Sequence, residues 1–328
     1  MKRRWFAGLR EDWRLVRQAR DVQGQARTPR TAQPHEIVKR PSPFGTGWAR
    51  TPAVQAARQV LQTGVLKPVT WNTVKPDVEG LDHLNNVDGP VVIVANHSSH
   101  LDAPLIIGSL PHRLRRRLAV GAAADYFFDK KWAAVITALV FNAFPIERRG
   151  SDRRRSLAPQ LLAENWNLLL FPEGTRSEDG WMTPPRLGPA HLCVQRRVPM
   201  IPVVLRGTFA AMPRDVNWRP GQHRVVVRYG KPIYPEPNEG ARALHARMMN
   251  ALARLWAEDE LGWYGSLRAQ AKGELSLPTG PLEITASSSS SASSGEAPAG
   301  GPPAVVPTGS WRRVWEASRP MPPSSKRR

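Results

Sequence analysis

Short apolar runs that alternate with helical stretches constrain the fold of this chain more than any other feature. Strand-like runs occur at residues 91–95, 118–122, 144–147, 168–171, 200–205 and 225–229, and the clearest helical patterns at 101–109, 156–165 and 239–257. Strands that alternate with helices favour a sheet whose connections cover its faces. We therefore predict an α/β fold with a single, mostly parallel sheet flanked by helices.

The first apolar run leads directly into the segment Asn-His-Ser-Ser-His-Leu-Asp at 96–102. Residues five apart on a continuous helix point about 140° away from each other. His97 and Asp102 can therefore pair only if His97 precedes a helix and Asp102 lies in its first turn, with Ser98 or Ser99 as the N-cap. Such a pair can deprotonate a hydroxyl group. The plainer alternative is a capping box beside a core histidine.

A second polar segment, Phe-Pro-Glu-Gly-Thr-Arg-Ser at 171–177, follows another apolar run. Pro172 and Gly174 end the strand and force a turn, which presents Glu173, Thr175 and Arg176 at the end of the strand. An arginine beside exposed backbone N–H groups is suited to binding a phosphate. A surface turn with a solvated ion pair is the alternative.

Two further segments are weaker signals. The run at 144–150 ends in the pair Arg148-Arg149, and the run at 198–205 contains Pro202. Proline has no backbone N–H to donate to a sheet, so Pro202 predicts an edge strand, a bulge or a wall for packing.

In this order, the four segments resemble the sequence blocks of the glycerolipid acyltransferases, in particular the 1-acylglycerol-3-phosphate acyltransferases. The blocks lie at 96–102, 144–148, 171–177 and 198–205, and the resemblance covers residues 50–265. It implies a glycerol-3-phosphate acyltransferase-like fold, with His97 of the His-x4-Asp motif as the general base and Asp102 as its orienting partner. It also assigns substrate binding to Arg148, Glu173, Gly174, Thr175 and Arg176, and the acyl pocket to Pro202. Arg149 can share the role of Arg148.

The resemblance implies transfer of an acyl group to the free hydroxyl of 1-acylglycerol-3-phosphate, which makes phosphatidic acid in phospholipid biosynthesis. The donor is acyl-CoA or acyl-carrier protein, which serves as a co-substrate, and no other cofactor is implied. Glycerol-3-phosphate or another lysolipid remains open as the acceptor. The single cysteine and the histidines show no spacing of metal ligands, so we expect no metal site.

The charge of the chain favours anionic partners. Lys and Arg number 47 against 27 Asp and Glu, a formal net charge of +20. An anionic membrane surface, acyl-CoA or an acidic carrier protein fits this charge. Nucleic acid is disfavoured because no reading motif accompanies the charge. The alternative to an enzyme is a basic protein that binds membranes or nucleic acid without catalysis.

Three regions are predicted along the chain. Residues 1–50 form a basic N-terminal helix and linker, with Trp5, Leu9, Trp13 and Val16 at helical spacing. Residues 51–265 form the acyltransferase domain, which begins with a helix at 54–66. Residues 266–328 form a low-complexity, disordered tail. With no predicted signal peptide or transmembrane helix, we expect a cytoplasmic protein attached peripherally to the cytoplasmic face of the membrane. The sequence leaves the oligomeric state open.

Overall fold

A mostly parallel sheet forms the centre of the computed structural model, which describes residues 45–123, 131–146, 157–213 and 223–280. The strands in these ranges are β1 (Asp77–Glu79), β2 (Val92–Ala95), β3 (Leu118–Ala123), β4 (Phe144–Ile146), β5 (Asn167–Leu170), β6 (Met200–Arg206) and β7 (Val226–Tyr229). They form one seven-stranded sheet in the order β1-β7-β6-β2-β5-β3-β4. Every neighbouring pair is parallel except β6 and β7. The predicted fold class is confirmed.

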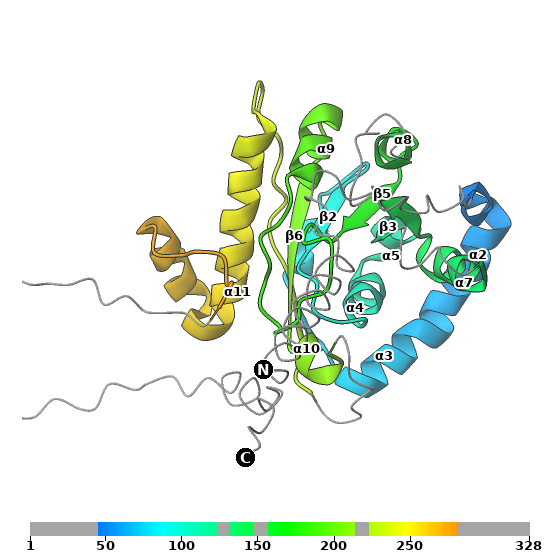
Figure 1. Cartoon of the computed structure of the whole chain (residues 1–328), viewed down its shortest axis with the longest axis horizontal. Coiled ribbons are helices and arrows are strands. Elements are labelled where there is room, and N and C mark those ends of the chain that lie inside the picture. The colour runs from blue at the N-terminus through cyan, green and yellow to red at the C-terminus, as the bar shows by residue number, and fades with distance from the viewer. Residues whose placement is uncertain (1–44, 124–130, 147–156, 214–222, 281–328) are drawn as a thin grey trace, which may run out of the picture. The chain divides into compact units, whose positions relative to one another are not determined.

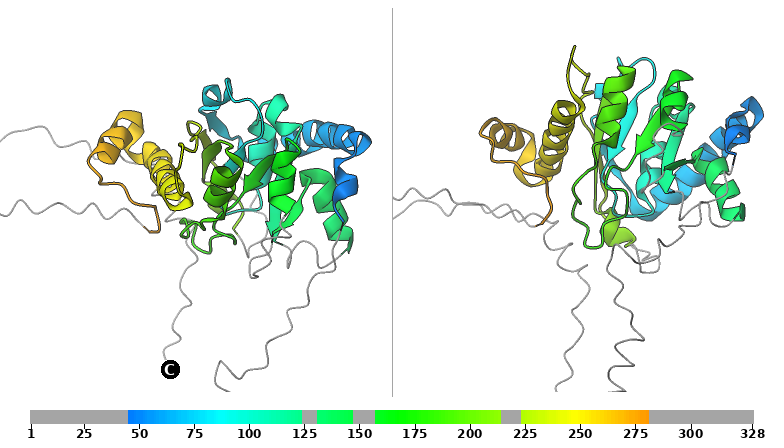
Figure 2. Two further views of the ribbon diagram at one scale, coloured as in Figure 1. Left: turned by 90° about the horizontal axis from the view of Figure 1, so that it is seen from above. Right: turned by 45° about the horizontal axis from the view of Figure 1, so that its top comes forward.

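Helices cover both faces of this sheet (Figure 1). The helices, including short 3-10 and π segments, are η1 (Gly47–Arg50), α2 (Pro52–Leu61), η2 (Gln62–Leu66), α3 (Lys67–Val74), η3 (Leu81–Leu84), α4 (Asp102–Ser109), α5 (His112–Arg115), α7 (Lys131–Phe141), α8 (Leu157–Ala163), α9 (Gly188–Arg196), α10 (Thr208–Ala211) and α11 (Ala241–Ala271). Figure 2 shows α11 and the pair α2 and α7 at opposite ends of the sheet.

The central strand β2 is buried on both faces, between β5 and β6. Because side chains alternate along a strand, Ile93 and Ala95 join the core on the α4 side, whereas Val92 and Val94 join the core with α8, α9 and α11. Burying each large aliphatic side chain stabilises the fold by about 1.5–3 kcal/mol. This packing fixes β2, and the segment that follows it, at the carboxyl edge of the sheet.

The structure differs from the prediction at the first helix and the first strand. The expected helix at 54–66 is part of a longer helical stretch, in which the π segment η2 leads into α3 with Pro68 in its first turn. Pro68 lies inside this continuous stretch, where its missing N–H removes one helical hydrogen bond next to the π segment. Strand β1 was missed because its three residues, Asp77, Val78 and Glu79, give almost no apolar signal.

Helix α11 runs to Ala271, past the predicted domain boundary at 265. A backbone kink at Gly262, with φ 70°, divides it. The part beyond the kink still packs, since Ser266 and Ala269 are buried and Met182 donates a backbone hydrogen bond to Pro278. The predicted N-terminal helix and linker, and the tail beyond residue 280, lie outside the described residues.

Ion pairs join α11 to the strands β6 and β7. Arg228 of β7 lies 2.6 Å from Glu79, 3.4 Å from Glu258 and 3.3 Å from Asp259. Arg206, the last residue of β6, also pairs with Asp259, at 3.6 Å. Burial alone would lower the pKa of Arg228, but the hydrogen bond to Glu79 and the surrounding carboxylates raise it above its ordinary value. These contacts fasten the part of α11 just before the kink to β6 and β7.

Candidate active site

The centre of the candidate site is the pair His97 and Asp102, between the end of β2 and the start of α4. His97 lies in the loop, Asp102 is the first residue of α4, and the imidazole Nδ1 is 2.9 Å from the carboxylate Oδ2. The predicted geometry of this pair is therefore confirmed. A carboxylate can only accept a hydrogen bond, so Nδ1 carries the proton and Nε2 is the basic ring nitrogen.

The Asp102 side chain also organises the loop before its helix. It is fully buried, and Oδ2 accepts the backbone N–H groups of Ser98 and Ser99, each at 2.8 Å. The predicted N-cap role of the two serines is wrong, because the N-cap position is Leu101 and no side chain caps it. The carboxylate instead binds the loop amides itself, which keeps it aimed at His97.

Polar contacts fasten this loop to the end of β6. Asn96 donates to the carbonyl of Leu205 at 2.9 Å and accepts its N–H at 2.8 Å. The hydroxyl of Ser98 is 2.9 Å from that of Thr208 in α10, and the hydroxyl of Ser99 donates to the carbonyl of Met212 at 2.8 Å. The site is thus a rigid junction of β2, β6 and α10.

Glu173 binds protein groups with both of its carboxylate oxygens. Oε1 accepts the backbone N–H of His97 at 2.8 Å, and Oε2 accepts the N–H and the hydroxyl of Thr183 at 3.0 and 2.8 Å. The side chain is buried, and burial raises its pKa. In this arrangement Glu173 fixes the backbone of His97. Thr183 carries no sequence signal, since it lies beyond the 171–177 segment.

The turn after β5 lies against the same histidine. The Phe171 ring stacks on the His97 ring, with centroids 4.1 Å apart. Gly174 has φ 78°, and a Cβ there would lie 2.9 Å from the guanidinium carbon of Arg186. Only glycine accepts this backbone conformation without strain. The sequence predicted the glycine turn, but it gave no indication that Arg186 lies beside it.

Arg176 approaches the site from this turn. Burial lowers the pKa of His100, and the charges of Arg176 and His97 lower it further, whereas the charge of Asp102 raises it. The N–H of Ser177 donates to the His97 carbonyl at 2.8 Å, which ties the turn to the loop. The structure therefore brings Glu173, Gly174, Thr175 and Arg176 to the His97 loop. Arg148 and Arg149 lie outside the described residues.

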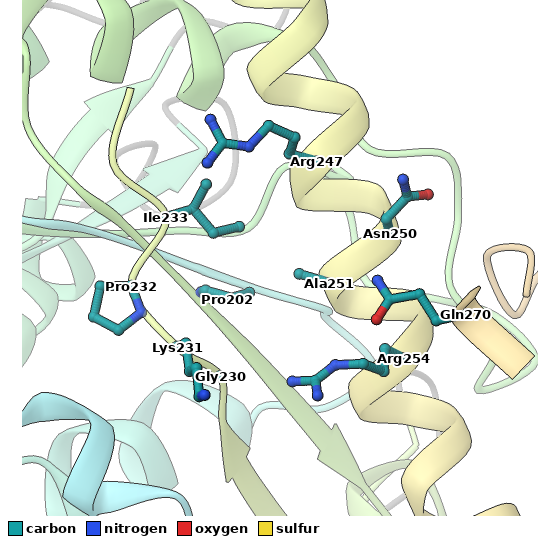
Figure 3. Close-up of a pocket in the computed structure, with 10 residues that line it drawn as sticks. All are labelled: Pro202, Gly230, Lys231, Pro232, Ile233, Arg247, Asn250, Ala251, Arg254 and Gln270. Atoms are coloured by element: carbon teal, nitrogen blue, oxygen red, sulfur yellow. The ribbon is translucent and has the colours of Figure 1, made fainter. Parts of the chain in front are cut away.

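Pro202 lies elsewhere, on the face of β6 that contacts α11. The pairing of β6 with β7 shifts by one residue between the Val203–Tyr229 pair and the Met200–Ile233 bridge, so Pro202 sits at a bulge, one of its predicted environments. It lines a cavity of about 290 Å³ whose wall includes Lys231, Arg247 and Arg254 (Figure 3). A role of Pro202 in binding an acyl chain stays a prediction.

Within the described ranges, no group of three His, Cys, Asp or Glu side chains is placed to hold a metal ion. Cys193 is buried, and burial raises the pKa of its thiol. This geometry supports proton transfer by His97. The Asp102 carboxylate holds its side chain, and the Glu173 carboxylate holds its backbone N–H.

Comparison with known proteins shows what the chain is similar to. Residues 75–206 match the family model described as Acyltransferase. A 1-acyl-sn-glycerol-3-phosphate acyltransferase of Chlamydomonas reinhardtii is 32% identical over 183 residues, which is 55% of this chain and 52% of that protein. The chloroplastic BAT2 protein of Brassica napus, with the same activity in its name, is 30% identical over 172 residues, or 49% of this chain and 45% of that protein.

The human 1-acyl-sn-glycerol-3-phosphate acyltransferase alpha is 31% identical over 176 residues, or 51% of this chain and 56% of that protein. The chain spans about half the length of the curated relatives it matches. The crystal structure of the acyltransferase PlsC from Thermotoga maritima aligns with a TM-score of 0.48 at 22% identity, and covers 64% of this chain and 84% of that one. Residues 75–206 of the chain thus match the acyltransferase family model, and the chain is similar to the 1-acylglycerol-3-phosphate acyltransferases.

Proposed function

We propose that this protein transfers an acyl group from a thioester, acyl-CoA or acyl-carrier protein, to the free hydroxyl of 1-acylglycerol-3-phosphate. The product is phosphatidic acid. The observation that carries the proposal is the 2.9 Å contact between His97 Nδ1 and the buried carboxylate of Asp102, which leaves Nε2 as the base. The names of the relatives support the choice of acceptor.

In the proposed reaction, His97 Nε2 takes the proton of the acceptor hydroxyl as its oxygen attacks the thioester carbonyl. A new C–O bond forms, the C–S bond breaks, and the imidazolium returns the proton to the leaving thiolate. The Asp102 carboxylate stabilises the transient imidazolium. General base catalysis of this kind contributes about 10²–10⁴-fold to a rate.

The phosphate of the acceptor would bind at the turn after β5. Arg176 supplies a positive charge next to the His97 loop, and the left-handed Gly174 keeps the turn free of side-chain bulk. Phosphate groups favour arginine because its guanidinium donates two parallel hydrogen bonds. We place Arg148 in the same role on the resemblance alone. Glu173 would serve by fixing His97 and not by binding glycerol directly.

The lipid substrates require contact with a membrane surface, and we place the protein on the cytoplasmic face. None of the described helices is long and apolar enough to span a membrane. Val60, Val65 and Val69 of the α2–η2–α3 stretch are 73%, 52% and 57% exposed, and Ile136 of α7 is 51% exposed. Arg58 and Gln62 hold these helices together through carbonyls of α7. Exposed apolar side chains of this kind are suited to peripheral membrane binding.

The test measures thiol release from oleoyl-CoA with lysophosphatidic acid, with the product identified as phosphatidic acid by mass spectrometry. His97→Ala should lose activity by about 10²–10⁴-fold. Asp102→Asn keeps an oxygen for the loop amides but removes the charge, so it should also lose activity. His191→Ala, at an exposed histidine on α9, is the matched control and should keep it.

Turnover only with glycerol-3-phosphate, or only with acyl-carrier protein as donor, would keep the mechanism and change the substrate. Full activity in folded His97→Ala would reject base catalysis by this residue. No turnover of any donor and acceptor pair by the folded protein would reject the enzymatic function.

A further inference from the structure

Three exposed apolar side chains cluster at the kink of α11. Leu261, Trp263 and Tyr264 are 46%, 65% and 73% exposed, although side chains of this size are usually buried. They flank Gly262, whose φ of 70° and ψ of 172° only glycine adopts readily. The kink turns the chain at this point, and these side chains remain outside the core while Ser266 and Ala269 beyond them are buried.

This kink lies at the same end of the sheet as the candidate active site. Arg206, at the carboxyl end of β6, reaches Glu260 and the carbonyl of Trp256 at 3.2 Å each. The preceding residue of β6, Leu205, exchanges two hydrogen bonds with Asn96 next to His97. Figure 1 shows the kink near α10, at the end toward which β6 runs.

The charges around the kink are compatible with an anionic surface. The acidic residues before it are engaged by arginines: Asp259 and Glu260 by Arg206, and Glu258 by Arg228 and Arg254. After the kink, Arg268 and Lys272 are exposed. The apolar side chains therefore project from a surface whose carboxylates are already paired with cations.

We propose that Leu261, Trp263 and Tyr264 insert into the headgroup region of an anionic membrane and hold the active-site end of the sheet against it. Trp and Tyr prefer this region because their rings are apolar while the indole N–H and the phenol O–H remain hydrated. The inference rests on the proposed function, since a lipid acceptor must reach this end of the sheet. Figure 2 shows α11 far from α2 and α7, so the kink is a second contact, separate from the α2–η2–α3 surface.

The experiment uses the full chain and the double variant Trp263→Ala/Tyr264→Ala. Co-sedimentation with phosphatidylcholine vesicles that contain phosphatidylglycerol measures binding. We expect partitioning to fall by about tenfold or more, given the apolar area removed. Tyr234→Ala is the matched control, because Tyr234 is also exposed, at 55%, but precedes α11 at its other end. If the double variant has a lower melting temperature, Tyr264→Ser replaces it.

A second measurement separates membrane contact from catalysis. With a short-chain lysophosphatidic acid below its critical micelle concentration and no vesicles, the variant should match the parent protein, while its activity on vesicle-bound acceptor falls. Failure of the proposed function would remove activity from the parent as well but would leave the vesicle-binding difference intact. Unchanged vesicle binding would overturn the inference, as would an equal loss in Tyr234→Ala. A changed oligomeric state with unchanged vesicle binding would assign the kink to a protein contact instead.

Discussion

At the scale of single residues, Glu173 is the most testable part of the site. Its two oxygens accept N–H groups from His97 and Thr183. In Glu173→Gln, one of these buried N–H groups would face an amide NH₂ and lose its acceptor. Such a loss costs about 1–3 kcal/mol. If this free energy is lost from the positioning of His97 in the transition state, we expect kcat to fall by roughly 5- to 150-fold.

The control for this variant is Glu274→Gln, since Glu274 is exposed beyond α11 and pairs only with Lys272 among the contacts described. Steady-state kinetics measure kcat of both variants, and thermal melts show whether both are folded. An unchanged kcat in a folded Glu173→Gln protein would show that the carboxylate does not position the base.

His100 should make stability depend on pH. Burial first, and then the charges of Arg176 and His97, lower its pKa in the folded protein below the ordinary 6.5. The unfolded chain therefore binds more protons just below pH 6.5, so folding stability decreases as the pH falls from 6.5 through the folded pKa. The loss is at most about 1.4 kcal/mol per pH unit for one group.

Urea unfolding at pH 7.5 and 5.5 measures this effect. His100→Gln should lose less stability than the parent protein over this interval, and His112→Gln, at an exposed histidine, should behave as the parent does. Identical pH dependence in all three proteins would contradict the burial of His100 beside a cation.

The sequence predicted the site only where the geometry is local. Five positions separate His97 from Asp102, so a loop and one helical turn decide whether they meet. The contact of Glu173 with the His97 amide spans 76 positions, and it depends on how the ends of β2 and β5 are placed. For the same reason, the contacts of Asn96 with Leu205 of β6, which span 109 positions, were not predicted.

At the scale of elements, Arg228 is the residue that joins β1, β7 and α11. It contacts Glu79, Glu258 and Asp259, and Asp259 is only 2% exposed. Arg228→Met would remove one cation from Glu258 and Asp259, while Arg254 and Arg206 would stay beside them. Because removing one partner of an uncompensated buried ion pair costs about 3–5 kcal/mol, this value is the upper bound. Chemical denaturation should show a loss of up to this size.

Arg254→Met is the matched control, because Arg254 pairs with Glu258 on the same helix at 3.6 Å. Because this pair lies within one helix, its loss leaves the contacts of α11 with the sheet intact and should cost less than Arg228→Met. Equal losses of stability in both variants would show that the ion pairs of Arg228 do not hold α11 on the sheet.

Elements were predictable where burial gives a continuous apolar run. β2, β5 and β6 are buried over their whole length, and each was located to within one residue of its ends. The part of α11 after residue 257 was not predicted, because charged residues and then exposed aromatic ones interrupt its apolar stripe. The kink at Gly262 could not be inferred, since glycine also occurs within regular helices.

At the scale of the whole molecule, packed structure continues beyond the predicted domain boundary of 265. Leu277 packs against the core that holds α9 and α11, and Pro278 accepts a hydrogen bond from Met182. Composition could not reveal this packing, because the segment after Lys272 is rich in residues typical of loops.

Two shortened chains test where the fold ends. A chain that ends at Gly280 should melt at the temperature of the full chain and retain acyl transfer. A chain that ends at residue 265 loses Ala269 and Leu277 from the packing, and burying one leucine contributes about 1.5–3 kcal/mol. It should therefore unfold at a lower temperature, which differential scanning calorimetry would detect. Equal melting of the two chains would place the boundary at 265 after all, whereas loss of transfer in the chain ending at 280 would assign residues 281–328 a part in the reaction.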